Sequence, residues 1–191
     1  MTDPWAVTPF PPHGDERPDD TYKMVGHALS NWETLEYQLA HLYAAFVGQT
    51  NKIAALREYG NGNIFTLRLR ALKSAAEPFF TVAPNQQAEG EFDRIALFAE
   101  RLADRRNEIA HGIVRPLQWV QQVMLEYLAI RGQALEYALV PALYTRKKLD
   151  EKHRPKYIYT ANELMQFSVA FFDLSQEALS LKQQIADAQR A

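Results

Sequence analysis

The chain has 191 residues, a formal charge of −2 and a pI near 6.2. This length suits one domain with a real hydrophobic core, and the near-neutral charge argues against nonspecific binding to long stretches of nucleic acid. The sequence contains no cysteine, which excludes disulfides, thiolate zinc sites and cysteine nucleophiles.

The chain also lacks the sequence features of secretion and membrane insertion. Its first residues show no basic segment followed by an apolar one, so we expect no signal peptide. No run approaches the roughly 18 apolar residues that a membrane span needs. We therefore expect a soluble, cytoplasmic protein that does not contact a membrane.

Residues 1–18 are proline-rich and predict a flexible arm, and residues 19–191 predict a single helical domain. Within that domain, apolar residues recur at spacings of three and four, which is typical of helices packed on one face. The expected helices are Thr21 to about Gly48, 52–59, Ile64 to about Phe79, Pro84–Ala110 and Ala161 to about Ala188.

Local signals predict where these helices begin and end. Asp19 or Asp20 is a suitable N-cap for the first helix, and Asn63 for the third. Pro78 argues against regular helix much beyond that point. Thr160–Glu163 has the pattern of a capping box, which predicts the start of the last helix, at 161–188.

Residues 117–159 are less regular and predict an insertion before the last helix. Trp119–Ala129 could be helical, and Lys156–Tyr159 is typical of a short strand. The predicted fold is therefore mainly α: an up-and-down bundle of four to five helices with a small irregular or β-hairpin insertion.

The sequence offers no metal site and no cofactor-binding motif. Phosphate-binding loops, nucleophile elbows and paired-histidine metal motifs are absent. His27 and His41 are fourteen positions apart, which separates them by about 21 Å along a helix. We expect neither a metal nor a cofactor.

Polar chemistry is concentrated in the stretch Arg105–Gly112, at the end of the fourth predicted helix. One interpretation is structural: Gly112 supplies a left-handed turn after the helix, and His111 lies at the negative end of the helix dipole. The other is a functional site, because a guanidinium, an amide and an imidazole can bind a phosphodiester and move a proton beside it. The residues alone leave both interpretations open.

Arg106-Asn107, followed by His111 after three residues, resembles the Arg-x(4–6)-His motif of HEPN domains (higher eukaryotes and prokaryotes nucleotide-binding). Arg-Asn-x-x-Ala-His-Gly is a common form of that motif, and this chain matches it. The family is an up-and-down bundle of four to five helices, as predicted here. The resemblance covers roughly residues 20–115 and 160–188, and leaves the arm and residues 117–159 as additions.

The resemblance implies a metal-independent endoribonuclease that acts as a homodimer, with two motifs in one cleft. In that case Arg106 would bind the phosphate, His111 would transfer protons and Asn107 would orient the His111 ring. The alternative is a non-catalytic relative that binds RNA, a nucleotide or a protein partner, so whether the chain is an enzyme is left open. Toxin-like proteins and phage defence are common themes of the family.

Further RNA contacts are expected from basic residues outside the motif, chiefly in the segment 146–156, which has six Lys or Arg and two acids. The candidates are Arg105, Arg146, Lys147, Lys148, Lys152 and Arg154. Arg105 could instead pair with Glu100 or Glu108. Glu36 is expected to hydrogen-bond within the bundle or pair with a neighbouring helix rather than enter the cleft.

One branch of the family has His-x-Tyr, and a partner antitoxin modifies that tyrosine. In this chain Gly112-Ile113 follow the motif histidine, without a tyrosine. The sequence therefore leaves an antitoxin partner open.

Overall fold

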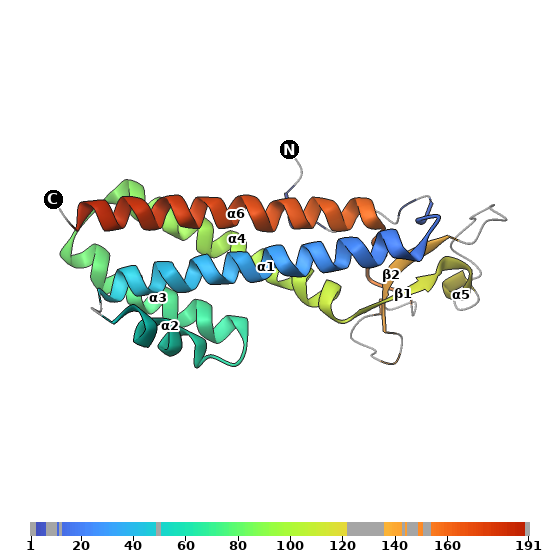
Figure 1. Ribbon diagram of the computed structural model, residues 1–191, viewed down its shortest axis with the longest axis horizontal. Coiled ribbons are helices and arrows are strands. Elements are labelled where there is room, and N and C mark those ends of the chain that lie inside the picture. Colours follow the sequence, from blue (N-terminus) through green and yellow to red (C-terminus); the bar gives the residue numbers. More distant parts are fainter. Residues whose placement is uncertain are drawn as a thin grey trace. The chain divides into compact units, whose positions relative to one another are not determined.

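The computed structural model describes residues 3–6, 11, 13–48, 51–121, 136–142, 144, 149–150 and 154–189. The chain is mainly helical, with a small two-stranded sheet before the last helix, which confirms the predicted fold class. The elements are α1 (Pro18–Val47), α2 (Lys52–Gly60), α3 (Phe65–Val82), α4 (Gln86–Ala110), β1 (Gly112–Pro116), α5 (Leu117–Gln121), β2 (Tyr137–Pro141) and α6 (Ala161–Ala188) (Figure 1). Of the helices in the described ranges, none has the length and hydropathy of a membrane span.

The chain divides into two compact units. The first consists of Met1–Ser30 and Asp104–Val169, and the second of Asn31–Ala103 and Ala170–Ala191. Helices α1, α4 and α6 each have residues in both units. The expectation of a single domain over 19–191 stays a prediction.

Aromatic rings organise the core of the second unit, which is a helical bundle. The ring of Trp32 on α1 meets Phe65 of α3 and Phe171 of α6 at centroid distances of 4.9 and 5.3 Å. Further along α1, Phe46 meets Phe92 of α4 at 5.1 Å. These edge-to-face contacts are favourable beyond the area that they bury. Helix α1 is therefore the one against which α3, α4 and α6 pack.

A buried ion pair ties α1 to the start of α3 in the same unit. Glu36 is only 8% exposed and accepts a hydrogen bond from Trp32 Nε1 at 2.7 Å. Arg68 donates to the two Glu36 carboxylate oxygens from Nε at 2.6 Å and from Nη2 at 2.9 Å, and from Nη1 to the Gly62 carbonyl at 2.8 Å. The prediction that Glu36 bonds within the bundle is confirmed.

The start of α1 differs from the prediction. The helix begins at Pro18, so Asp19 and Asp20 lie inside its first turn rather than at the N-cap. Proline suits the first helical position because its missing N–H would have no partner there. The two carboxylates still favour the helix, since they lie at the positive end of its dipole.

Both ends of α3 also differ from the prediction. The residue in the N-cap position is Ile64, whose side chain makes no capping bond, rather than Asn63. The helix continues through Pro78 to Val82. A proline this close to the end of a helix removes one internal hydrogen bond without preventing the last turn from packing.

The start of α6 confirms one half of the predicted capping box, the bond from the Thr160 N–H to Glu163, and adds a residue to it. The Thr160 N–H donates to Glu163 Oε2 at 2.8 Å, and the Thr160 hydroxyl donates to the same oxygen. Asp15 Oδ2 accepts from the Ala161 N–H at 2.9 Å and from the Thr21 hydroxyl at 2.5 Å. The predicted arm is therefore anchored at Asp15, which joins the first turns of α1 and α6.

Strands β1 and β2 form an antiparallel pair in the first unit (Figure 1), with Gly112 opposite Pro141 and Pro116 opposite Tyr137. Helix α5 follows β1 directly, so the helix predicted over 119–129 is seen only as far as Gln121, and positions 122–129 lie outside the described residues. The apolar residues that pack between these elements are Leu117, Val120, Ala138, Val140 and Ile158.

The other edge of β2 is also covered. Tyr137 exchanges backbone hydrogen bonds with Asp15, and Leu139 exchanges them with Tyr159. The strand predicted over Lys156–Tyr159 is wrong in extent, because only Tyr159 pairs with β2. Both edges of the short strand β2 are thus occupied, which protects it from pairing with another chain.

Gly112 contradicts the interpretation of the motif as a glycine-capped helix. Its φ is not positive, and it is the first residue of β1. A Cβ at this position would lie 2.6 Å from Leu139 Cγ, and Leu139 is only 1% exposed. Glycine is needed here because β2 approaches closely, not because the backbone is left-handed.

We predict that Arg68→Met lowers the free energy of unfolding by about 3 kcal/mol, because it leaves the buried Glu36 carboxylate without its cation. The control Arg70→Met changes an exposed arginine on the same helix and should cost less than about 0.5 kcal/mol. Urea denaturation of the two variants measures both values. Equal losses would contradict the role given to the buried pair.

We also predict opposite effects for two glycine-to-alanine substitutions. Gly112→Ala should destabilise the protein by roughly 1–3 kcal/mol, since Leu139 has no room to move. Gly90→Ala, inside α4 with no described atom within 4 Å of the new Cβ, should stabilise it by about 0.5–1 kcal/mol. Thermal unfolding tests this, and a neutral Gly112→Ala would refute the close approach.

Candidate functional site

The motif residues lie at the C-terminal end of α4, in the first unit. The helix ends at Ala110, but the His111 N–H still donates to the Asn107 carbonyl at 3.1 Å, so His111 continues the helical turn. The side chains of Asn107 and His111 are exposed, and Arg106 is partly exposed. The chain then enters β1, which fixes the direction in which it leaves the helix.

Arg106 and Asn107 interact directly. Arg106 Nη1 donates to Asn107 Oδ1 at 3.2 Å, and Asn107 lies one helical turn before His111. The structure therefore brings Arg106 and Asn107 into contact and places His111 one turn after Asn107, at the accessible end of α4. Orientation of the His111 ring by the Asn107 amide stays a prediction.

Arg105 has a different environment from Arg106. Its Nη1 lies 3.0 Å from Glu108 Oε2 and donates to Tyr159 Oη at 3.1 Å, and the Tyr159 hydroxyl donates to the same Glu108 oxygen at 2.5 Å. The side chains of Arg105 and Glu108 are 11% and 22% exposed. Of the two predicted roles, the structure shows Arg105 in the ion pair with Glu108, and contact with RNA stays a prediction.

Two tyrosines complete this cluster. The Tyr157 hydroxyl donates to the Glu108 backbone carbonyl at 3.0 Å, which satisfies one of the last carbonyls of α4. The Tyr157 and Tyr159 rings stack at 5.0 Å, and Tyr159 meets Phe167 of α6 at 5.1 Å. We call Arg105, Glu108, Tyr157 and Tyr159 the anchor cluster.

The tyrosines of the anchor cluster are held as hydrogen-bond donors. Burial, together with the negative charge of Glu108, raises the pKa of both Tyr157 and Tyr159 well above that of a free tyrosine. Sequence analysis missed both residues. The available signal was their spacing of two, which places both rings on one face of an extended segment.

A groove with exposed aromatic residues lies beside β1, also in the first unit. It has a volume of about 350 Å³, and its lining includes Ile113, Arg115, Trp119 and Tyr144. The Arg115 guanidinium lies 5.9 Å from the Trp119 ring centroid, and Trp119 and Tyr144 are 59% and 89% exposed. Exposed aromatic rings beside an arginine suit the stacking of an unpaired base. Sequence analysis did not identify this groove.

Most of the predicted basic segment lies outside the described residues, including Arg146, Lys147, Lys148 and Lys152. Arg154 is described. Its Nε donates to Asp150 Oδ2 at 2.5 Å, and its N–H donates to Asp150 Oδ1 at 2.8 Å. An RNA contact of Arg154 would compete with this local pair and stays a prediction.

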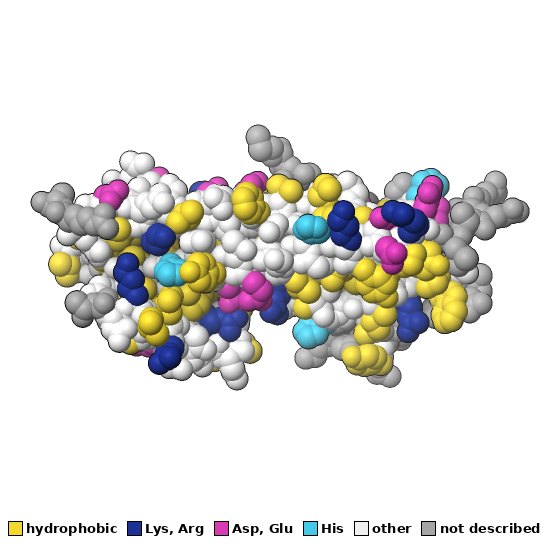
Figure 2. Space-filling model, in the orientation of Figure 1, with side chains coloured by type: hydrophobic (Ala, Val, Ile, Leu, Met, Phe, Trp, Pro, Cys, Tyr) yellow, Lys and Arg dark blue, Asp and Glu magenta, His cyan; other side chains and the backbone are white. Residues whose placement is uncertain are grey.

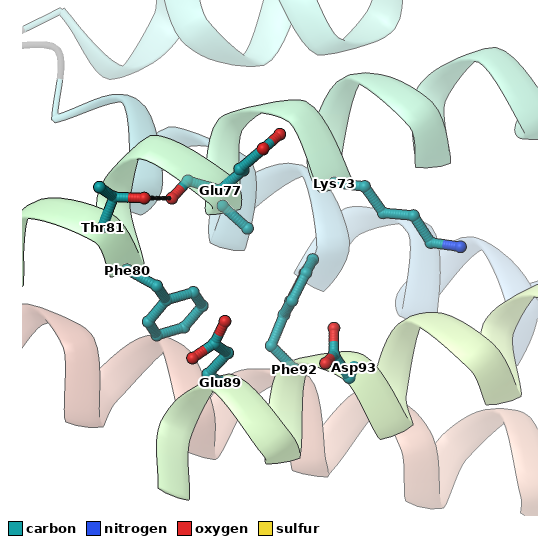
Figure 3. A pocket seen from close by; sticks show the side chains of 8 residues that line it. Lys73, Glu77, Phe80, Thr81, Glu89, Phe92 and Asp93 are labelled. Atoms are coloured by element: carbon teal, nitrogen blue, oxygen red, sulfur yellow. Dashed lines mark hydrogen bonds between the residues drawn. The ribbon is translucent and has the colours of Figure 1, made fainter. Parts of the chain in front are cut away.

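A second pocket, in the second unit, is lined by acidic residues, whereas the groove beside β1 contains an arginine. It lies between α3 and α4 with a volume of about 300 Å³, and Figure 3 shows Glu77 of α3 with Glu89 and Asp93 of α4 around it. Lys73 also lines the pocket, and its charge is paired with Glu100 at 3.1 Å. Three carboxylates would repel a polyanion, so this pocket does not suit RNA. In the part of the chain that the structure describes, no cluster of His, Asp or Glu is arranged to hold a metal ion.

No protein-family model matches the chain, and neither a curated protein nor a solved structure matches it. The function is therefore inferred from residues 106–111, which we call the motif turn, and from the residues that hold them.

We predict that Glu108→Gln lowers the free energy of unfolding by about 3 kcal/mol, because Arg105 would lose its counter-ion while nearly buried. The matched control is Glu100→Gln on the same helix, whose pair with Lys73 is about half exposed and is worth about 0–1 kcal/mol. Chemical denaturation of both variants measures the difference. A loss for Glu108→Gln no larger than that of the control would contradict the anchor cluster.

Proposed function

We propose that this chain is a HEPN-like endoribonuclease that cleaves RNA without a metal ion, as a homodimer with two motif turns in one cleft. The observation that carries the proposal is the difference in environment between the adjacent residues Arg105 and Arg106. Arg105 is held in the anchor cluster, while Arg106 lies with Asn107 and His111 on an accessible turn.

The chemistry requires groups that this turn supplies. In the proposed reaction a base removes the proton from a ribose 2'-hydroxyl, whose oxygen attacks the adjacent phosphorus, and an acid protonates the 5'-oxygen as the P–O bond breaks. Imidazole suits both roles near neutral pH. One motif supplies one histidine, and a two-fold dimer supplies two, one for each proton transfer.

Arg106 has the role of the phosphate-binding group in this proposal. A guanidinium is always charged and presents a fork of N–H donors that matches phosphate oxygens. It would also stabilise the extra negative charge that develops on the pentacovalent phosphorus. Its contact with Asn107 limits the positions that the guanidinium adopts.

The aromatic groove beside β1 supports a single-stranded substrate. Trp119 and Tyr144 offer ring faces to bases, and such stacking requires bases that are not paired in a duplex. One of the groove's lining residues is Ile113, which follows His111 by two positions in the sequence. We therefore favour unpaired segments of RNA as the substrate.

We predict cleavage of single-stranded RNA in the presence of a chelator, and loss of about 10²-fold or more in rate for His111→Ala, since that is the usual contribution of a general acid or base. The control is His27→Ala, which removes an exposed histidine of α1 and should leave the rate unchanged. Gel assays with an end-labelled RNA measure the rates. Unchanged cleavage by His111→Ala would overturn the catalytic role.

The same samples distinguish the alternative, a non-catalytic module that binds RNA, a nucleotide or a protein. In that case the unaltered protein would bind RNA without cleaving it, Arg106→Ala would weaken binding and His111→Ala would not. Sedimentation velocity tests the shared cleft, since a protein that cleaves RNA as a monomer would contradict it.

A further inference from the structure

A third pocket lies in the second unit, where the C-terminal end of α1, the first residue of α2 and the last turns of α6 meet. Its volume is about 410 Å³. The residues that matter to its chemistry are His41 and Gly48 of the α1 end, Lys52 of α2 and Lys182 of α6. The pocket does not include the motif turn, so a role for it is independent of the proposed function.

The charged groups in the lining of this pocket are all basic. Lys52 and Lys182 are among the lining residues, and no Asp or Glu lines the pocket among the residues that the structure describes. Figure 2 shows basic side chains and a histidine gathered over the C-terminal parts of α1 and α6, at the left of the view. Two ammonium groups facing one cavity repel each other and attract an anion.

The charges of Lys52 and Lys182 both act on His41. Burial and the charges of Lys182 and Lys52 lower the pKa of His41 below that of a free histidine. The His41 ring packs edge-on against Tyr37 at 4.5 Å, which fixes its position. His41 Nε2 is buried and has no hydrogen-bond partner among the residues that the structure describes. Such an atom is rare in a native protein and calls for a partner.

The backbone around the pocket leaves room for a ligand and favours a negative one. Gly48 has φ of 62°, and in the described part of the chain a Cβ added there would meet no atom within 4 Å. Helix α2 has no acidic residue in its first turn and begins with Lys52, a cation at the positive end of the helix dipole. An anion near this end would offset both the charge of Lys52 and the positive end of the helix dipole.

We propose that this pocket binds a small phosphate monoester as its dianion. Two ammonium groups balance the two negative charges, and the phosphate oxygens offer an acceptor to a His41 N–H. The volume lies in the range of sites for small organic ligands and exceeds what inorganic phosphate alone needs. His41, Lys52 and Lys182 are the residues that would contact the phosphate.

The test is calorimetric titration of the full chain with inorganic phosphate and with glycerol 3-phosphate, in a buffer without other phosphate. We expect saturable binding in roughly the millimolar range or tighter, with the monoester bound more tightly than inorganic phosphate. Lys52→Gln and Lys182→Gln should each weaken binding at least about fivefold. Lys23→Gln, at an exposed position of α1, should leave it unchanged.

A second measurement ties binding to His41. NMR titration of the histidine rings should show that saturating glycerol 3-phosphate raises the pKa of His41. The bound dianion attracts the protonated ring, and this attraction opposes the repulsion by Lys52 and Lys182. Absence of saturable binding, or equal binding by the Lys52→Gln, Lys182→Gln double variant, would overturn the proposal. Binding that is lost in Arg106→Ala but kept in Lys182→Gln would overturn it as well, by locating the ligand at the motif turn.

Discussion

The last turn of α4 depends on one hydrogen-bonded ion pair, that of Arg105 with Glu108, and on the tyrosine hydroxyl of Tyr159 that joins both. A nearly buried guanidinium requires a counter-ion, and the carboxylate requires donors, and this arrangement pairs Arg105 Nη1, the Tyr159 hydroxyl and Glu108 Oε2 with one another. Because Tyr159 also pairs with β2 and packs on α6, the cluster fixes the helix end relative to both. Arg106, Asn107 and His111 are left accessible on the same turn.

The second unit also contains a buried ion pair joined by hydrogen bonds. Glu36 lies in an apolar core, where Trp32 and Arg68 donate hydrogen bonds to its carboxylate. Arg68 also binds the turn before α3. In both units we expect the buried charge to disfavour other pairings of these elements, since another pairing would leave that charge unsatisfied. Apolar contacts alone, which tolerate sliding, specify position less sharply.

Local signals in the sequence were sufficient for the fold class, for most helix boundaries and for α6, whose capping box lies within four residues. Features that depend on distant residues could not be predicted in this way. Tyr157 and Tyr159 meet Glu108 across 49 and 51 positions, and Gly112 is required by Leu139, a residue on another strand. The motif was found because its residues lie within six consecutive positions. The pocket lined by His41, Lys52 and Lys182 was not found, because α1, α2 and α6 each contribute only part of it.

The most direct test of the central claim, that the anchor cluster holds the motif turn as a unit, is a double-mutant cycle between Glu108 and Tyr159. The free energies of unfolding of Glu108→Gln, Tyr159→Phe and the double variant give the coupling between the two side chains. We predict a coupling energy of about 1 kcal/mol or more, because a charged hydrogen bond joins them in a nearly buried setting. Effects that add to within about 0.3 kcal/mol would contradict the claim.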